Sequence, residues 1–70
     1  MVRAKFKCES IKQTTWGREF EFSPVISGSP ENEAFFKTTP VGKVTLGVKN
    51  EGVSFEVGKE YYLDLTEVQT

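Results

Sequence analysis

The sequence predicts a mainly β protein: a small five-stranded barrel or a curved antiparallel sheet, with one short helix between the second and third strands. Apolar and polar residues alternate along several short stretches, which is the period of a half-buried strand. Glycine, proline and asparagine separate these stretches at regular intervals, as in small all-β domains. Six phenylalanines, two tyrosines and one tryptophan supply a large apolar area for a 70-residue chain. We therefore expect a single β-rich domain over residues 1–70.

The first two strands are expected to form a hairpin. Residues 2–12 alternate, and their apolar set is Val2, Ala4, Phe6 and Cys8. After a turn that contains glycine, residues 18–25 alternate again, with Phe20 and Phe22 directed inward. Basic residues of the first strand and Glu19 and Glu21 of the second would share the outer face. Lys–Glu pairs across the strands would then stabilise the hairpin by roughly a few tenths of a kcal/mol each.

A short helix is expected to follow the hairpin. Ser29 is a suitable N-cap, and Pro30 suits the first helical position, where its missing N–H is not needed. The helix is expected to end near Lys37, after about two turns. We expect it to plug one open end of the barrel, with Phe35 or Phe36 directed into the core, because a helix cannot bury two adjacent side chains equally.

Three further strands are expected to form a meander. Residues 44–48, 53–57 and 60–66 alternate, and Asn50 and Gly52 allow a hairpin turn between the first two of these segments. Full closure of the resulting sheet would remove its exposed edges.

The composition argues against most enzymes. There is no histidine, and Cys8 is the only cysteine, so we expect no catalytic residue, metal site or cofactor. Cys8 alternates with apolar residues and is interpreted as a core position rather than a reactive thiol. No apolar run approaches the roughly 20 residues of a membrane helix, and no secretory signal is recognised at the N-terminus. These features predict a cytoplasmic protein that does not contact a membrane.

Exposed basic and aromatic residues are the candidate binding surface. The candidates are Arg3, Lys5, Lys7, Trp16, Arg18, Phe35, Phe36 and Tyr62. A basic row on a strand with a nearby aromatic ring is typical of single-stranded nucleic-acid binding by small barrels. The same lysines also protect an edge strand from aggregation, and a net charge of −1 is unusual for a nucleic-acid binder.

A spaced pattern covers most of the chain: Ser29-Pro30-Glu31-Asn32-Glu33, Phe35-Phe36, Thr39-Pro40 and Gly42, followed by Phe55, Gly58-Lys59-Glu60-Tyr61-Tyr62 and Asp64. With the opening Ala4-Lys5-Phe6-Lys7-Cys8, it resembles a family of short uncharacterised proteins encoded by tailed bacteriophages. The sequence departs from that family between Asn50 and Phe55, where a longer connection is expected. The resemblance implies a phage origin and a setting in the infected bacterial cytoplasm or the virion, and it implies no activity.

Three functional hypotheses remain open from the sequence. The first is a non-enzymatic phage accessory protein that binds a host or phage protein. The second is a single-stranded nucleic-acid-binding barrel that uses Arg3, Lys5, Lys7 and Trp16. The third is a virion or decoration component that packs by pairing strand edges with its neighbours. The sequence does not define the oligomeric state.

Overall fold

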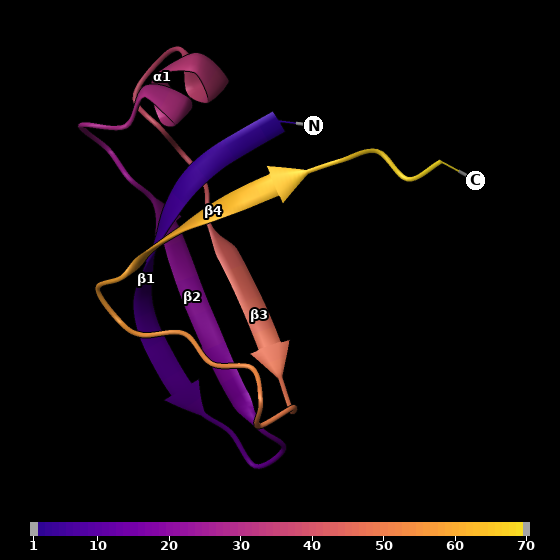
Figure 1. The fold of residues 1–70 in the computed structure, drawn as a ribbon. Helices are drawn as coiled ribbons and strands as arrows, with labels where there is room; N and C mark the ends of the chain where they lie inside the picture. The colour runs from indigo at the N-terminus through magenta and orange to yellow at the C-terminus, as the bar shows by residue number, and fades with distance from the viewer. Residues whose placement is uncertain (1, 70) are drawn as a thin grey trace.

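The computed structural model describes residues 2–69 and has four strands and one short helix (Figure 1). In chain order the elements are β1 (Val2–Gln13), β2 (Arg18–Pro24), α1 (Pro30–Phe36), β3 (Val44–Val48) and β4 (Glu60–Leu65). The mainly β class and the helix between the second and third strands are confirmed, but the described strands number four instead of five. Within residues 2–69 there is no helix with the length and apolar character needed to cross a membrane.

All four strands pair antiparallel, in the order β3-β2-β1-β4. This is the order of a Greek key, in which the fourth strand returns to lie beside the first. It is possible because β1 is long: residues 2–7 pair with β4 and residues 6–13 pair with β2. The sheet curls into a half-barrel whose two edge strands are β3 and β4 (Figure 1). The expected meander after the helix is therefore wrong, since β4 pairs with β1 rather than with its sequence neighbours.

The core lies on the concave face of the half-barrel. Its buried hydrophobic residues are Ala4, Phe6, Cys8, Phe20 and Phe22. These inward positions were all expected from the alternation of the first two strands, and they are confirmed. Val2, expected on the same face, is 52% exposed at the end of β1, opposite Leu65 of β4.

A β-bulge keeps the apolar face of β1 continuous. Cys8 pairs with Phe22 and Ser10 pairs with the next residue of β2, Glu21, so Glu9 is an extra residue on β1. Beyond the bulge, Ile11 pairs with Phe20. The extra residue reverses the alternation, and Ile11 thereby shares the concave face with Cys8. Bulges also increase local twist and bending, which suits a strand that must pair with both β2 and β4.

Residues 53–57 form no strand, which contradicts the fifth strand expected from their alternation. The chain instead crosses the open side of the sheet from β3 to β4 (Figure 1). The Arg18 guanidinium donates to the carbonyl oxygens of Asn50 and Val53, at 3.2 and 2.5 Å. The Glu56 amide donates to the Tyr61 hydroxyl at 3.0 Å. Hydrogen bonds to the side chains of Arg18 and Tyr61 thus satisfy backbone groups that would bond to a neighbouring strand if this segment were part of the sheet.

Only one apolar residue of that segment packs on the core. Phe55 contacts the core cluster, whereas Val53 and Val57 are 36% and 56% exposed. Residues 53–57 therefore alternate in sequence without forming a strand, and Phe55 alone anchors the loop on the core. Alternation over five residues does not distinguish such a loop from a strand.

The helix begins and ends close to the expected positions. The Ser29 hydroxyl accepts a hydrogen bond from the Asn32 amide at 3.2 Å, and Pro30 occupies the first turn. The C-cap is Lys37, in the left-handed conformation with φ 61°. α1 lies at one end of the half-barrel, where Phe36 packs on the core and Phe35 is 41% exposed (Figure 1). Phe36 is therefore the inward phenylalanine.

We expect Lys37→Gly to stabilise the fold by about 0.5 to 1 kcal/mol, because glycine adopts a left-handed backbone without the Cβ clash that lysine carries. The greater flexibility of glycine in the unfolded chain offsets part of this gain. Urea denaturation measures the change, and Thr38→Gly, one residue further on, is the matched control. A loss of stability in Lys37→Gly would contradict the left-handed cap.

Candidate binding surfaces

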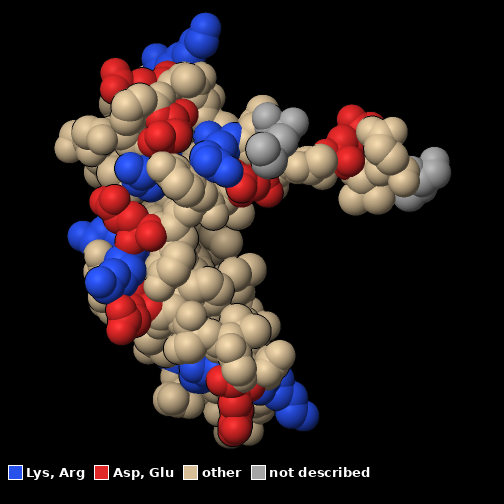
Figure 2. Space-filling model, viewed as in Figure 1, with Lys and Arg blue, Asp and Glu red and all other residues tan. Residues whose placement is uncertain are grey.

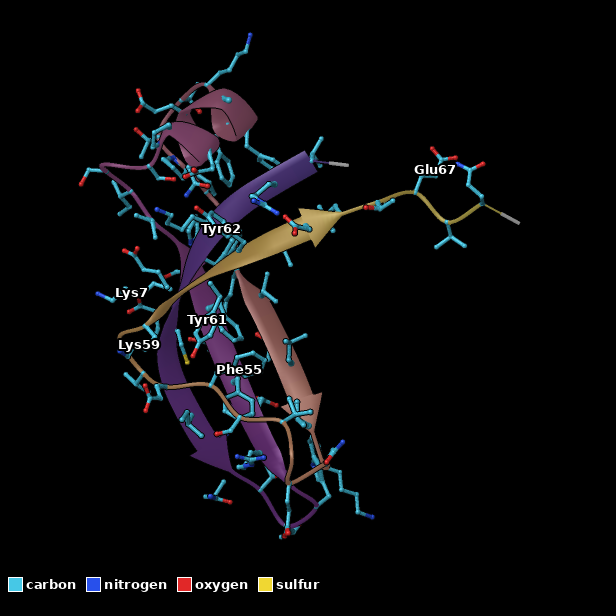
Figure 3. All side chains as sticks on the ribbon, viewed as in Figure 1. Lys7, Phe55, Lys59, Tyr61, Tyr62 and Glu67 are labelled. Atoms are coloured by element: carbon cyan, nitrogen blue, oxygen red, sulfur yellow. The ribbon has the colours of Figure 1, made fainter. Side chains whose placement is uncertain are left out.

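The open side of the half-barrel forms an apolar cavity of about 190 Å³, which we call the concave groove. Its lining comes from all four strands and the crossing loop: Phe6, Phe22, Val44, Leu46, Phe55, Tyr61, Tyr62 and Leu63. The rings of Phe22, Phe55 and Tyr61 meet edge to face, with centroids 5.2 to 6.0 Å apart. Figure 3 shows Phe55 and Tyr61 in this space below β4, and Figure 2 shows the hollow to be free of charged atoms.

β3 forms one lip of the groove. Val44 and Val48 are half-buried and Leu46 is 41% exposed. The strand contains no proline and no charged residue, and its nearest charges are Lys43 and Lys49 at its two ends. Charges, proline or a covering loop normally protect an edge strand from pairing with another chain. The middle of β3 lacks the first two of these protections.

No family model, curated protein or solved structure matches this chain. What the groove and the surfaces around it can bind is therefore argued from their own residues.

A second cluster lies on the outer face of β1 and β4, where three of the candidate residues meet. Lys5 pairs with Tyr62 across the two strands. The Arg3 guanidinium lies 4.5 Å from the centroid of the Tyr62 ring, and the Lys5 ammonium lies 5.7 Å from it. Tyr62 remains 52% exposed. Cation–π contacts at such exposed sites stabilise only weakly, because water competes for the cation.

Acidic residues balance the charge of this cluster. Arg3 forms a two-pronged pair with Asp64, at 2.6 and 3.0 Å. The Lys5 ammonium lies 3.8 Å from Glu31 and 3.9 Å from Glu60. These acids belong to α1 and β4, so the expectation that β2 supplies the partners of the basic row is wrong. A basic row neutralised in this way has less charge to offer a phosphate backbone.

Of the remaining candidates, Lys7 lies beside this cluster and the others lie apart from it. Lys7 is exposed on the same outer face, opposite Glu60. Trp16 is 49% exposed at the far turn, where its ring covers Gly47: a Cβ on Gly47 would lie 2.5 Å from the Trp16 Cη2. Arg18 is turned to the concave face, with its guanidinium 5.1 Å from the centroid of the Phe20 ring. The structure thus gathers Arg3, Lys5, Lys7 and Tyr62, and separates Trp16, Arg18 and Phe35 from them.

The Arg3–Asp64 pair makes stability depend on pH. Its hydrogen bonds lower the pKa of Asp64 and raise that of Arg3. Because the folded-state pKa of Asp64 is lowered, the pair stabilises the fold above the unfolded pKa of about 4 and loses that effect as the pH falls through the folded value. We expect Arg3→Gln to raise the pKa of Asp64, measured by NMR titration of the carboxyl carbon. An unchanged pKa would contradict the pairing, and Lys12→Gln is the control.

Cys8 is fully buried, and burial raises the pKa of its thiol. Because only the thiolate reacts, we expect the native protein to react at least about 100-fold more slowly with a thiol-specific reagent than the protein in urea. Equal rates would contradict the burial of the Cys8 thiol.

Among residues 2–69, no three histidine, cysteine, aspartate or glutamate side chains gather closely enough to hold a metal ion.

Asn32 has a structural role that was not predicted from the sequence. This side chain is 2% exposed and bonds the backbone of Lys5 and Val25. One signal was present: Asn32 lies four residues before Phe36, so both occupy one face of the helix. A polar residue on the face that carries the core anchor indicates a buried hydrogen-bonding role.

Proposed function

We propose that the protein has no catalytic role and works by binding another protein chain through the concave groove. The observation that carries this proposal is an uncharged cavity of about 190 Å³ beside an edge strand that carries no charge of its own. An extended segment can add to such an edge through main-chain hydrogen bonds, while one of its side chains fills the neighbouring pocket. The volume of the cavity suits a single apolar side chain of the partner rather than a whole small-molecule ligand, since ligand pockets usually measure about 300 to 1,000 Å³.

The proposed setting follows from the resemblance to short tailed-bacteriophage proteins. We propose the cytoplasm of an infected bacterium as the setting, with a host or phage protein as partner. In a virion, the same edge of β3 would pair with a neighbouring subunit. Both settings use one mode of binding, strand addition beside an apolar pocket.

Single-stranded nucleic acid is the alternative partner, and the geometry supports it less well. Arg3 and Lys5 are paired with carboxylates, and Arg18 lies on the concave face. Lys7 and Trp16 remain exposed on the surface. A labelled single-stranded oligonucleotide is therefore expected not to bind the protein in a salt-dependent way. The double variant Lys5→Glu/Lys7→Glu is the control, because it would abolish any binding that these lysines mediate. If the wild-type protein does show such binding and the double variant does not, nucleic acid replaces protein as the proposed partner.

A groove variant with a matched control tests the proposed function. Leu46→Lys places a charge on the lip of the groove, whereas Val41→Lys makes the same kind of change at a residue that is 83% exposed. A protein captured from infected cells is identified, purified and titrated by calorimetry against all three forms. We expect Leu46→Lys to bind at least about 10-fold more weakly and Val41→Lys to bind like the wild type. Equal affinity for Leu46→Lys would overturn the groove as the binding site.

A further inference from the structure

The chain itself carries an extended segment with the chemistry that the groove and its lip would accept. Beyond β4, residues 66–69 are exposed and run away from the body of the molecule (Figures 1 and 3). Leu65 at the end of β4 is 50% exposed and Val68 is 76% exposed. Acidic residues accompany them, Asp64 and Glu67. The segment from Asp64 to Val68 thus combines apolar side chains with negative charge.

β3 complements this segment in length and charge. β3 has five residues, as does the stretch from Asp64 to Val68. Either would span about 17 Å as a strand. Lys43 is already paired with Glu21 at 2.9 Å. Asp64 is likewise paired with Arg3. The opposite charges that remain to meet across the two strands are therefore Lys49 at the end of β3 and Glu67 of the segment. Opposite charges on neighbouring strands favour their pairing.

The isolated chain exposes more surface than an average folded monomer of its mass. The accessible surface is 5310 Å², whereas a folded monomer of 7.9 kDa exposes about 4,400 Å². The radius of gyration is 13.4 Å, against about 11 Å for a compact domain of this length. The excess of surface is about 900 Å². A standard stable interface removes about 800 Å² from each partner.

We propose that the occupant of the groove is a second copy of this chain, whose residues 64–68 lie along β3. This inference rests on the proposed function, because it uses the same groove, and it names the partner. The segment points away from the groove of its own chain in Figure 1, so a second molecule supplies it. Reciprocal exchange gives a two-fold symmetric dimer in which both segments and both β3 edges are used. Such an arrangement is closed and stops at two chains.

The mass of the protein in solution tests this inference. Sedimentation equilibrium of the full chain is expected to give twice the monomer mass of 7.9 kDa, with a dissociation constant of about 1 µM or lower. Leu46→Lys and a truncation that ends at Leu65 are expected to be monomers. Val41→Lys is expected to remain a dimer. Circular dichroism checks that each variant is folded, which we expect because Leu46, Val41 and residues 66–69 are exposed.

Each other outcome overturns a stated part of the inference. A wild-type monomer at about 100 µM would overturn the second copy as occupant, and the calorimetric test with another protein would still decide the proposed function. A dimer that survives Leu46→Lys would place the interface outside the groove. A dimer that survives the truncation would show that residues 66–70 do not form the contact. Dissociation of Val41→Lys would show that the effect of added charge is not specific to the groove.

Discussion

Asn32→Asp is expected to destabilise the fold by about 2 to 4 kcal/mol at neutral pH. The Asn32 Oδ1 accepts from the Lys5 amide at 2.6 Å, and its Nδ2 donates to the Lys5 and Val25 carbonyls, both at 2.8 Å. The side-chain amide therefore acts as one more peptide unit beside β1, just beyond the end of β2. Aspartate has nearly the same shape, but its second oxygen would face two carbonyl oxygens, and its charge would be buried.

The same variant should recover part of its stability in acid. Burial of the new carboxylate raises its folded-state pKa, so the destabilisation grows as the pH rises through the unfolded value of about 4. Urea denaturation at pH 7 and near pH 4 measures both effects. Asn50→Asp is the matched control, because the exposed Asn50 Oδ1 accepts from the Gly52 amide and aspartate keeps that acceptor. Equal losses of stability in the two variants would contradict the role assigned to Asn32.

Phe55→Ala is expected to destabilise the fold by about 2 to 4 kcal/mol. The Phe55 ring meets Phe20, Phe22 and Tyr61 edge to face, with centroids 5.1 to 5.2 Å apart. It is the anchor of the loop that crosses the open side of the sheet, and it forms part of the groove wall. Its loss would release the loop as well as open a cavity, so amide exchange in residues 50–59 should accelerate.

Val57→Ala is the control for Phe55→Ala, since Val57 is 56% exposed in the same loop. Its effect is expected to stay within about 0.5 kcal/mol. A regular strand over residues 53–57 would instead make both residues contribute to one ladder and give both variants comparable effects. Comparable losses would therefore support a fifth strand over the crossing loop.

Local sequence patterns were sufficient to predict the features that depend only on residues close together in the sequence. Alternation placed Phe20 and Phe22 correctly in the core, because a half-buried strand must have period two. The cap at Ser29 was predicted correctly because hydroxyl capping acts over three residues. The same holds for Cys8, whose burial follows from its neighbours in β1.

Long-range pairing was beyond the reach of these patterns. Alternation in β4 shows that one face is buried, but not that its partner is β1 at the other end of the chain. The bulge beside Cys8 and the bonds from Arg18 to residues 50–53 likewise depend on segments that meet only after folding. The error over residues 53–57 has this origin.

The candidate surface was predicted only in part for the same reason. Arg3, Lys5 and Tyr62 were chosen as exposed residues, and they do lie together on the surface. Their acidic partners could not be named, because Asp64 and Glu31 reach them from distant segments. The groove was missed entirely, since it exists only where β3 and β4 fail to close the barrel.

Hydrogen–deuterium exchange of the β3 backbone amides, measured at two protein concentrations, tests most directly whether a second chain occupies the groove. If a second chain adds to this edge, the outward amides of Val44–Val48 become protected as the protein is concentrated from about 1 to 100 µM, and Leu46→Lys removes that protection. Amides on the inner side of β3, already bonded to β2, should change less. Outward amides that exchange equally fast at both concentrations would contradict the pairing of a second copy with β3.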